Sequence, residues 1–222
     1  MGYRFRTGLH ACDVGGSLVF LDVVADRYFA IDGAARDACL RLVQGRRVTS
    51  SDAVVIDELR QSGLLQSAEG AATPQLCPTV RPVTSSPRDR LAKTPGLQII
   101  GAALIRYAIA IVDLRFRPLH VVLGNVSRSK QMMIGRDTTV ATDPAAFATA
   151  FAHLDRVITS LDRCLPRSIA LASAMIANGF APDLVLGVKL RPFEAHCWVQ
   201  LGGLLVSDDL GTIAPFAPIL IL

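Results

Sequence analysis

Residues 67–95 constrain the fold of this chain more than any other segment, because they contain five of its twelve prolines. Proline lacks a backbone N–H and fixes φ, so such a stretch cannot sustain a helix or a central strand. Its prolines stand among Ser, Thr, Gly and Ala, a composition typical of linkers. We therefore expect a small domain at residues 1–66, a linker at 67–95 and a larger domain at 96–222.

The charge of the chain is spread over all three segments. Residues 1–66 carry 8 Lys/Arg against 8 Asp/Glu, residues 67–95 carry 4 against 2, and residues 96–222 carry 11 against 9. No segment concentrates basic charge as a nucleic-acid binder would, so we expect no nucleic-acid partner. The hydrophobic fraction of 51% predicts well-cored globular domains.

The five cysteines are scattered, with no C-x-x-C pair and no secretory signal at the start of the chain. This usage predicts reduced thiols and a cytoplasmic location. The histidines outside the site discussed below have no partner at metal-ligand spacing, and glycine-rich phosphate loops are absent. We therefore expect neither a metal nor a cofactor.

One run, Leu97–Leu114, is apolar enough to raise the question of a membrane span. Arg106 and Tyr107 interrupt its middle, and an unpaired arginine is costly inside a bilayer. We expect a buried helix here and no stable membrane insertion, with association at a membrane surface as the lesser alternative.

The first domain reads as strands followed by helices. Strand-like runs and helical spacing predict the following elements: strands at Phe5–Cys12, Leu18–Val24 and Arg27–Ile31, then helices at Ala34–Val43 and from Ser51. This order predicts a small winged-helix-like domain. The hydrophobic core of so small a domain gives only marginal stability by itself.

The second domain begins with helices and ends with strands, so the fold class of the chain is α+β. The expected helices are Leu97–Leu114, Pro118–Ser127 and Pro144–Leu161, and a further helix and a β-meander follow them. The last residues, Ile213–Leu222, are expected to lie as an extended segment on the core.

Cys164 stands directly before a stretch that is predicted to form a buried helix. Pro166 suits a first helical turn, residues Ile169–Ala177 are nearly all apolar, and an Asn-Gly pair follows as a natural end. The N-terminus of a helix favours a thiolate, and its free N–H groups suit an oxyanion hole. The alternative is an ordinary core cysteine.

His196 lies on a predicted strand that a glycine pair connects to a second strand. Alternation places Cys197 on a buried face and His196 on the more polar face, beside Trp198. The returning strand brings Asp208 or Asp209 opposite His196, depending on the length of the turn. A carboxylate there could orient the imidazole, as the third member of a nucleophile–base–acid set does.

These residues stand in three short motifs: Cys164-Leu-Pro-Arg-Ser-Ile-Ala-Leu171, Ala195-His196-Cys-Trp-Val199 and Gly203-x-x-Val206-Ser-Asp208. Together they resemble the transglutaminase-like B proteins of lasso-peptide biosynthesis, the leader peptidases of bacterial ribosomal-peptide pathways. The resemblance spans residues 100–210. It implies a transglutaminase-like or papain-like domain in which Cys164 is the nucleophile, His196 the general base and Asp208, not Asp209, the orienting acid.

The chain departs from that family pattern at two positions. Cys197 replaces the alanine that is usual between the histidine and the tryptophan, and Ser207 stands where asparagine is common before the aspartate. We expect neither change to abolish the chemistry, because Cys197 faces the core and Ser207 is a loop-side neighbour.

The N-terminal part resembles the leader-recognition element of the same family, which is similar to the pyrroloquinoline-quinone peptide chaperone. The resemblance implies that a precursor peptide adds a strand beside Arg27–Ile31 and packs against Val54–Leu64. The expected lining of that groove is Tyr28, Phe29, Leu59 and Leu64. The family also implies an asparagine-synthetase-like lasso cyclase as a partner.

The sequence therefore predicts a cysteine endopeptidase that removes the leader from a lasso precursor. An acyl transferase or amidase that uses the same three residues is one alternative. A non-catalytic binding module, either a leader-binding chaperone or a winged-helix DNA binder, is the other, and the balanced charge of residues 1–66 weighs against DNA.

Overall fold

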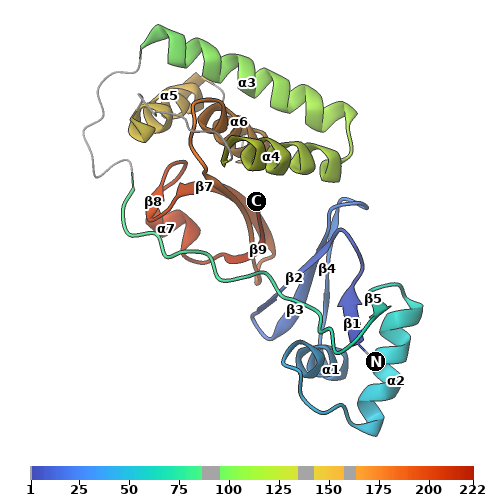
Figure 1. The fold of residues 1–222 in the computed structure, drawn as a ribbon. Helices are drawn as coiled ribbons and strands as arrows, with labels where there is room; N and C mark the ends of the chain where they lie inside the picture. The colour runs from blue at the N-terminus through green and yellow to red at the C-terminus, as the bar shows by residue number, and fades with distance from the viewer. Residues whose placement is uncertain (1, 87–95, 135–142, 158–163) are drawn as a thin grey trace. The chain divides into compact units, whose positions relative to one another are not determined.

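The computed structural model describes residues 2–86, 96–134, 143–157 and 164–222 (Figure 1). These residues form two compact units. The first contains Met1–Thr79, Val188–Phe193 and Ala217–Leu220, and the second contains Val80–Gly187, Glu194–Phe216 and Ile221–Leu222. Residues 87–95 of the expected linker and residues 158–161 of an expected helix lie outside the described residues.

The first unit contains two small antiparallel sheets and two helices. Its elements are β1 (Gly2–Phe5), β2 (Leu9–Val14), β3 (Ser17–Asp22), β4 (Arg27–Ile31), α1 (Gly33–Val43), α2 (Ser50–Gln61) and β5 (Leu65–Ala68). Strands β2, β3 and β4 form a meander, in which β4 is an edge strand. Strand β1 pairs with β5 instead.

The expected strand at Phe5–Cys12 is two strands in the structure, because the chain turns between them. Gly8 has a φ of +82°, a conformation that residues with a side chain rarely adopt. Strand β1 then pairs with β5, some sixty residues later in the chain. That pairing has no local signal in the sequence, which explains why the prediction merged β1 and β2.

The core of the first unit forms around Phe20, which is fully buried. Its ring meets that of Phe5 edge-on at 5.3 Å and stacks on Phe29 at 5.1 Å, measured between ring centroids. Residues of α1, α2 and β5 complete this core. Helix α2 begins in a capping box, in which the Thr49 hydroxyl accepts from the N–H of Asp52 and the Asp52 carboxylate accepts from the N–H of Thr49.

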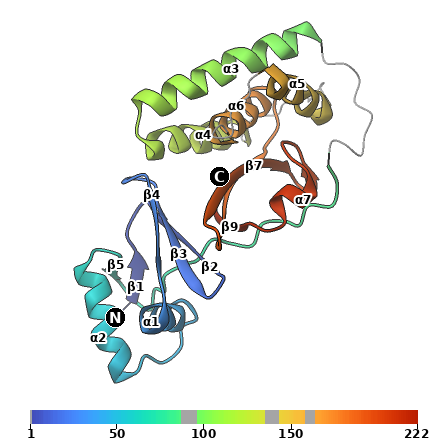
Figure 2. The same ribbon diagram turned by 180° about the vertical axis from the view of Figure 1, so that it is seen from behind.

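The second unit gathers its helices around α6. Its elements are α3 (Leu97–Phe116), α4 (Leu119–Ile134), α5 (Pro144–Val157), α6 (Cys164–Ala177), β6 (Asp183–Lys189), β7 (Glu194–Leu201), β8 (Leu204–Leu205) and α7 (Leu210–Ile213). Helices α3, α4 and α5 each pack against α6, and α6 packs against β7. Both ribbon views show α6 between the other helices and the sheet (Figures 1 and 2).

The sheet has the strand order β8-β7-β6-β9, where β9 is Ala217–Ile221. The expected extended C-terminal segment is thus a strand of this sheet. The prediction of an α+β fold is confirmed. No helix among the described residues is long and apolar enough to cross a membrane.

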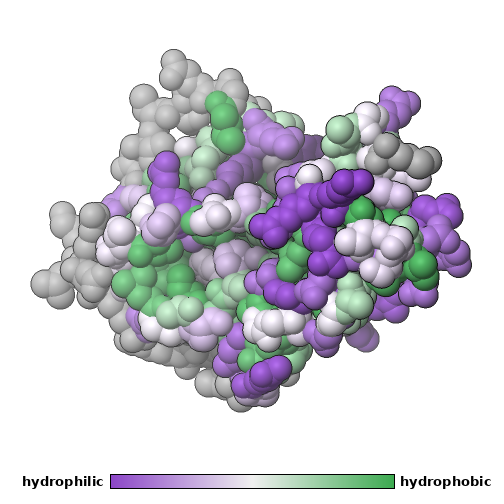
Figure 3. Space-filling view, turned by 90° about the horizontal axis from the view of Figure 1, so that it is seen from below, coloured by the Kyte–Doolittle hydropathy of each residue, from purple (hydrophilic) through white to green (hydrophobic). Residues whose placement is uncertain are grey.

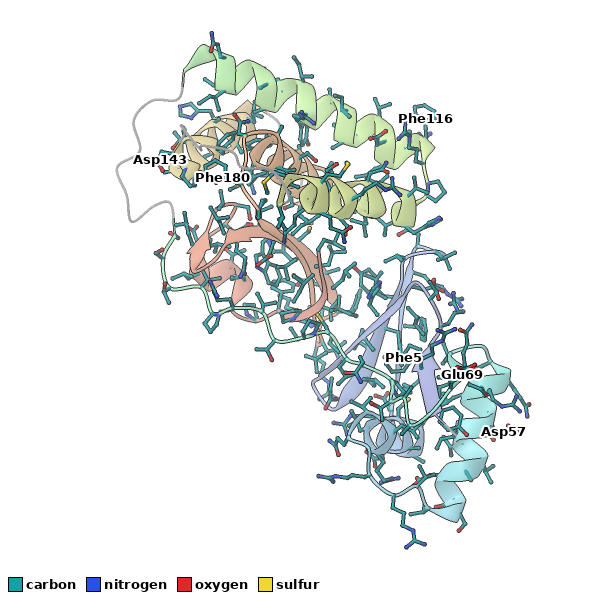
Figure 4. The ribbon with its side chains drawn as sticks, viewed as in Figure 1. Phe5, Asp57, Glu69, Phe116, Asp143 and Phe180 are labelled. Atoms are coloured by element: carbon teal, nitrogen blue, oxygen red, sulfur yellow. The ribbon has the colours of Figure 1, made fainter. Side chains whose placement is uncertain are left out.

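Helix α3 differs from the buried helix that the sequence predicts. One side, with Ala103, Tyr107 and Ala110, is buried, whereas the other is exposed along the length of the helix. Phe116 lies at its C-terminal end (Figure 4) with 79% of its surface exposed. On the face of the protein seen in Figure 3, hydrophobic and hydrophilic side chains both reach the surface.

Replacing Phe20 with alanine should lower the free energy of unfolding by about 3–5 kcal/mol, because the change leaves a cavity between two aromatic rings. Urea denaturation followed by circular dichroism measures this loss. Val54→Ala is the control: Val54 is 63% exposed, so the change should cost less than about 0.5 kcal/mol. Equal losses for the two variants would contradict the core described here.

Candidate active site

Cys164 is the first residue of α6, and its side chain is half-buried. The helix forms because a proline in its first turn needs no N–H partner and because the residues from Ile169 to Ile176 are mostly apolar and buried. The first N–H groups of a helix have no partner within it, and the helix dipole favours negative charge at this end. The thiol therefore lies at the end of α6 where N–H groups without a helical partner are available.

A buried hydrogen bond fixes the start of α6 against strand β7. The Ser168 hydroxyl donates to the carbonyl oxygen of Cys197 at 2.8 Å, and Ser168 is fully buried. Since Cys197 follows His196 directly in the strand, this bond holds the helix beside the histidine. The Cys164 side chain is close enough to His196 to raise the pKa of the imidazole.

The turn between β7 and β8 brings Asp208 to the histidine. Leu201 pairs with Leu204 across a two-residue turn, and the N–H of Val206 donates to the carbonyl of Val199 at 2.8 Å. The chain then leaves the sheet, so Asp208 lies within reach. Its Oδ1 is 3.3 Å from Nε2 of His196. Continued pairing would have placed Asp209 opposite His196, and the departure from the sheet decides between the two aspartates.

Ser207 and Arg167 support the carboxylate of Asp208, and the sequence interpretation gave neither of them a role. The Ser207 hydroxyl accepts from the N–H of Val199 at 2.9 Å and donates to Oδ2 of Asp208. Nη1 of Arg167 lies 3.9 Å from the same oxygen. Ser207 lies in the loop after β8, next to Asp208, but its side chain is buried and binds the carboxylate directly, which the sequence did not indicate.

These contacts shift the acid–base balance of the site. Burial lowers the pKa of His196, but hydrogen bonds to Asp208 and Cys164 outweigh it and raise the pKa to about 9. Burial raises the pKa of Asp208, yet bonds from His196 and Ser207, with the charges of His196 and Arg167, leave it below its usual value. An imidazolium–carboxylate pair is therefore favoured at neutral pH. Because Asp208 occupies Nε2, Nδ1 is the ring nitrogen left to face the thiol.

The other cysteines are poorly suited to nucleophilic chemistry. Burial raises the pKa of Cys12 to about 12 and those of Cys39 and Cys77 to about 11. Cys197 is buried next to the site, and burial raises the pKa of its thiol well above the usual value. The expected burial of Cys197 is confirmed, and a buried thiol of this kind is inert.

Two aromatic rings, those of Trp198 and Phe216, pack near the imidazole of His196. The centroid of its ring lies 6.3 Å from that of Trp198 and 5.3 Å from that of Phe216. Trp198 is buried and donates through Nε1 to Gln200 at 3.2 Å, so the face of β7 that the sequence marked as polar is covered in the structure. Gly187 on β6 makes room for Trp198: a Cβ there would lie 2.5 Å from the indole ring.

The four residues expected to line a peptide groove lie in the first unit. Tyr28 and Phe29 are half-buried neighbours on β4, where Tyr28 packs against Phe193 with ring centroids 5.4 Å apart and Phe29 stacks on Phe20. Leu59 is 7% exposed and belongs to the core, and Leu64 packs against that core. Across the described part of the chain, no group of three His, Cys, Asp or Glu side chains is placed to hold a metal.

The sequence of the second unit matches a known protein family. The sequence model of the transglutaminase-like superfamily matches residues 103–221, which is more than half of the chain and includes all three polar residues of the site. The chain belongs to the transglutaminase-like superfamily. The recognition of such a protein from the sequence motifs is thereby confirmed.

Among curated proteins, the microcin J25-processing protein McjB of Escherichia coli is 38% identical to this chain over 45 residues. That stretch covers 20% of this chain and 22% of McjB, so the similarity spans about a fifth of the relative's length. It is consistent with the resemblance to lasso-peptide B proteins. No solved structure matches the chain significantly.

Asp208→Asn should lower the pKa of His196 from about 9, because the carboxylate is the strongest of the contacts that raise it while burial continues to lower it. A titration of the histidine ring signals by NMR measures the shift. Asp209→Asn is the matched control and should leave the titration nearly unchanged. If the two variants behaved alike, Asp208 would not be the partner of His196.

The raised pKa also links His196 to stability. His196 binds its proton more tightly in the folded state than in the unfolded state. Its contribution to the free energy of unfolding is therefore complete below the unfolded pKa of 6.5 and is lost as the pH rises through about 9.

Gly187→Ala should destabilise the second unit by about 1–3 kcal/mol, because the new methyl group would overlap the Trp198 ring. Chemical denaturation measures the loss, and intrinsic fluorescence should report the displaced indole, since Trp198 is the single tryptophan of the chain. Gly124→Ala is the control, as a Cβ at Gly124 meets nothing within 4 Å. An unchanged emission spectrum in Gly187→Ala would contradict the close approach.

Proposed function

We propose that this protein is a cysteine endopeptidase that removes the leader from a ribosomally made lasso precursor. The observation that carries the proposal is the set Cys164–His196–Asp208, in which a thiol at a helix N-terminus lies near an imidazole held by a half-buried carboxylate. The superfamily assignment and the similarity to a microcin-processing protein support it.

In the proposed reaction, the Cys164 sulfur attacks the carbonyl carbon at the leader–core junction. The oxygen that becomes negative is stabilised by N–H groups at the start of α6, where Pro166 leaves those of Cys164, Leu165 and Arg167 as candidates. The His196 imidazolium then gives its proton to the leaving amine as the C–N bond breaks, which leaves an acyl group on Cys164.

Water then hydrolyses the acyl-enzyme. The imidazole of His196, now neutral, takes a proton from the attacking water, and the C–S bond breaks to restore the thiolate. Asp208 remains ionised throughout and holds the ring orientation through Nε2. The products are a leader with a free carboxylate and a core with a free N-terminal amine, which an asparagine-synthetase-like cyclase could join into a macrolactam.

We also propose that residues 1–66 recognise the precursor peptide, with 67–95 as a linker and 96–222 as the peptidase domain. Strand β4 supports this assignment, because it is an edge strand of its three-stranded sheet. An edge strand offers unpaired N–H and C=O groups to an added peptide strand. Tyr28 lies on this strand, and we propose it together with Phe29, Leu59 and Leu64 as the peptide-binding set. Leu59 and Leu64 would contribute through the core that they form below the peptide.

Cys164→Ala should abolish cleavage of the precursor, because the substitution removes the proposed nucleophile. Mass spectrometry of the precursor incubated with each variant measures cleavage. Cys77→Ala is the matched control, since Cys77 is also half-buried and should not be needed for cleavage. Equal cleavage by Cys164→Ala and wild-type protein would rule out the nucleophile.

Tyr28→Ala should raise the KM for the precursor and leave kcat nearly unchanged, because Tyr28 is proposed to bind the peptide.

The same experiment addresses the alternatives. An acyl transferase or amidase would give an amide when an added amine competes with water, whereas a peptidase would give mainly the free acid. A leader-binding chaperone would bind the precursor without cutting it, and Cys164→Ala would then keep full biological function.

A further inference from the structure

Helix α3 presents an apolar stripe to solvent that nothing in the described chain covers. Ile105, Ile109, Val112 and Phe116 follow the 4-3-4 spacing of one helix face, and their exposed fractions are 63%, 49%, 54% and 79%. Apolar residues also fill the opposite face, which packs on α6. Contiguous apolar surface of this kind is uncommon on a soluble protein and marks an interaction site, so the outer face calls for a partner.

A cavity of about 430 Å³ extends this surface from α3 towards α4. Ile109 and Arg106 line it from α3, and Met132 and Met133 line it from α4. Met132 is 58% exposed, and Ile134 at the end of the same helix is 63% exposed. The apolar surface therefore involves both helices.

Arginines border the stripe on its two sides. At about 100° per residue, Arg106 lies about 100° to one side of Ile105, and Arg115 lies about 80° to the other. Both arginines are exposed, and within the described residues neither forms an ion pair. Long basic side chains at the margins of an apolar face can keep their charges in water while their stems cover apolar surface.

The basic charge of the chain collects around this surface. Residues 97–134 contain five Lys/Arg and one Asp, a formal charge of +4 that equals the net charge of the whole chain. The single acid, Asp113, is paired with Arg117 at 3.2 Å. The charge counts over residues 1–66, 67–95 and 96–222 did not reveal this concentration of basic charge, because those segments are too long.

The charges argue against a second copy of the chain as the partner. Residues 97–134 carry a formal charge of +4, so a pair of copies joined through α3 would bring two basic surfaces together. Surfaces of like charge repel each other, so the stripe is poorly suited to itself.

We propose that the outer face of α3 binds the surface of a membrane that contains anionic lipids. The stripe would lie parallel to the membrane surface. The side chains of Ile105, Ile109, Val112 and Phe116 would enter the boundary between the headgroups and the acyl chains. Arg106 and Arg115 would contact lipid phosphates. The inner face of α3 stays packed on α6, so binding needs no rearrangement. This inference does not depend on the proposed peptidase activity.

Vesicle flotation with the full-length protein tests the proposal. The protein should float with vesicles of phosphatidylcholine and phosphatidylglycerol, bind phosphatidylcholine alone much more weakly, and lose binding as salt is raised. Arg106→Gln/Arg115→Gln should weaken binding by roughly tenfold or more. Arg46→Gln/Arg47→Gln, which removes two exposed charges from the first unit, is the matched control and should change binding little.

Phe116→Ser should also weaken binding, on the order of tenfold, because it removes the most exposed apolar side chain of the stripe. Its control is Val54→Ser, at a residue that is 63% exposed on α2. In a second measurement, brominated lipid should quench Phe116→Trp more than Val54→Trp, with Trp198 as a common background. All these substitutions are on the surface, so melting temperatures should change little.

Several results would overturn the proposal. One is failure of the wild-type protein to bind anionic vesicles, which would favour a protein partner for the stripe. Others are equal binding to neutral vesicles, and equal losses in the stripe variants and their controls. A wild-type dimer in solution that Phe116→Ser converts to a monomer would assign the face to a second copy of the chain.

Discussion

The site depends on one half-buried charge pair, the imidazolium of His196 and the carboxylate of Asp208. Burial acts against the charged form of each group, so the pair persists only because other contacts compensate. The Ser207 hydroxyl and the guanidinium of Arg167 supply two of them on the side of the carboxylate, and the Cys164 thiol supplies another on the side of the ring. The charged state of the pair therefore depends in part on Ser207 and Arg167, which act on the Asp208 carboxylate.

Strand β7 is the frame that aligns these groups. Its backbone receives the hydroxyl of Ser168 at the carbonyl of Cys197 and gives the N–H of Val199 to Ser207. These two bonds lie on either side of Trp198, close to His196, so one strand fixes both the helix that carries the nucleophile and the loop that carries the acid. A shift of β7 would disturb both partners of His196 together, which couples the packing of the sheet to the geometry of the site.

Local patterns in the sequence predicted much of this arrangement. Periodicity placed most helices and strands, and Pro166 marked the helix that begins at Cys164. Strand pairing alone left Asp208 and Asp209 open, because the choice depends on where the chain leaves the sheet after Val206. The pairing of β1 with β5 and the hydrogen bond from the N–H of Val199 to Ser207 join separate segments, and no local periodicity encodes them.

Helix α3 shows why apolar composition alone does not determine burial. Its length and hydrophobicity predicted a core helix, yet α6 is wide enough to cover only one of its sides. The side that packs contains the small residues Ala103 and Ala110 beside Tyr107, which allow close approach of the two helices. The exposed side contains larger aliphatic residues and Phe116, whose exposure to water is unfavourable. A stripe of this kind between two unpaired arginines is explained more simply by an interaction surface than by core packing, because a core would leave both charges without solvent.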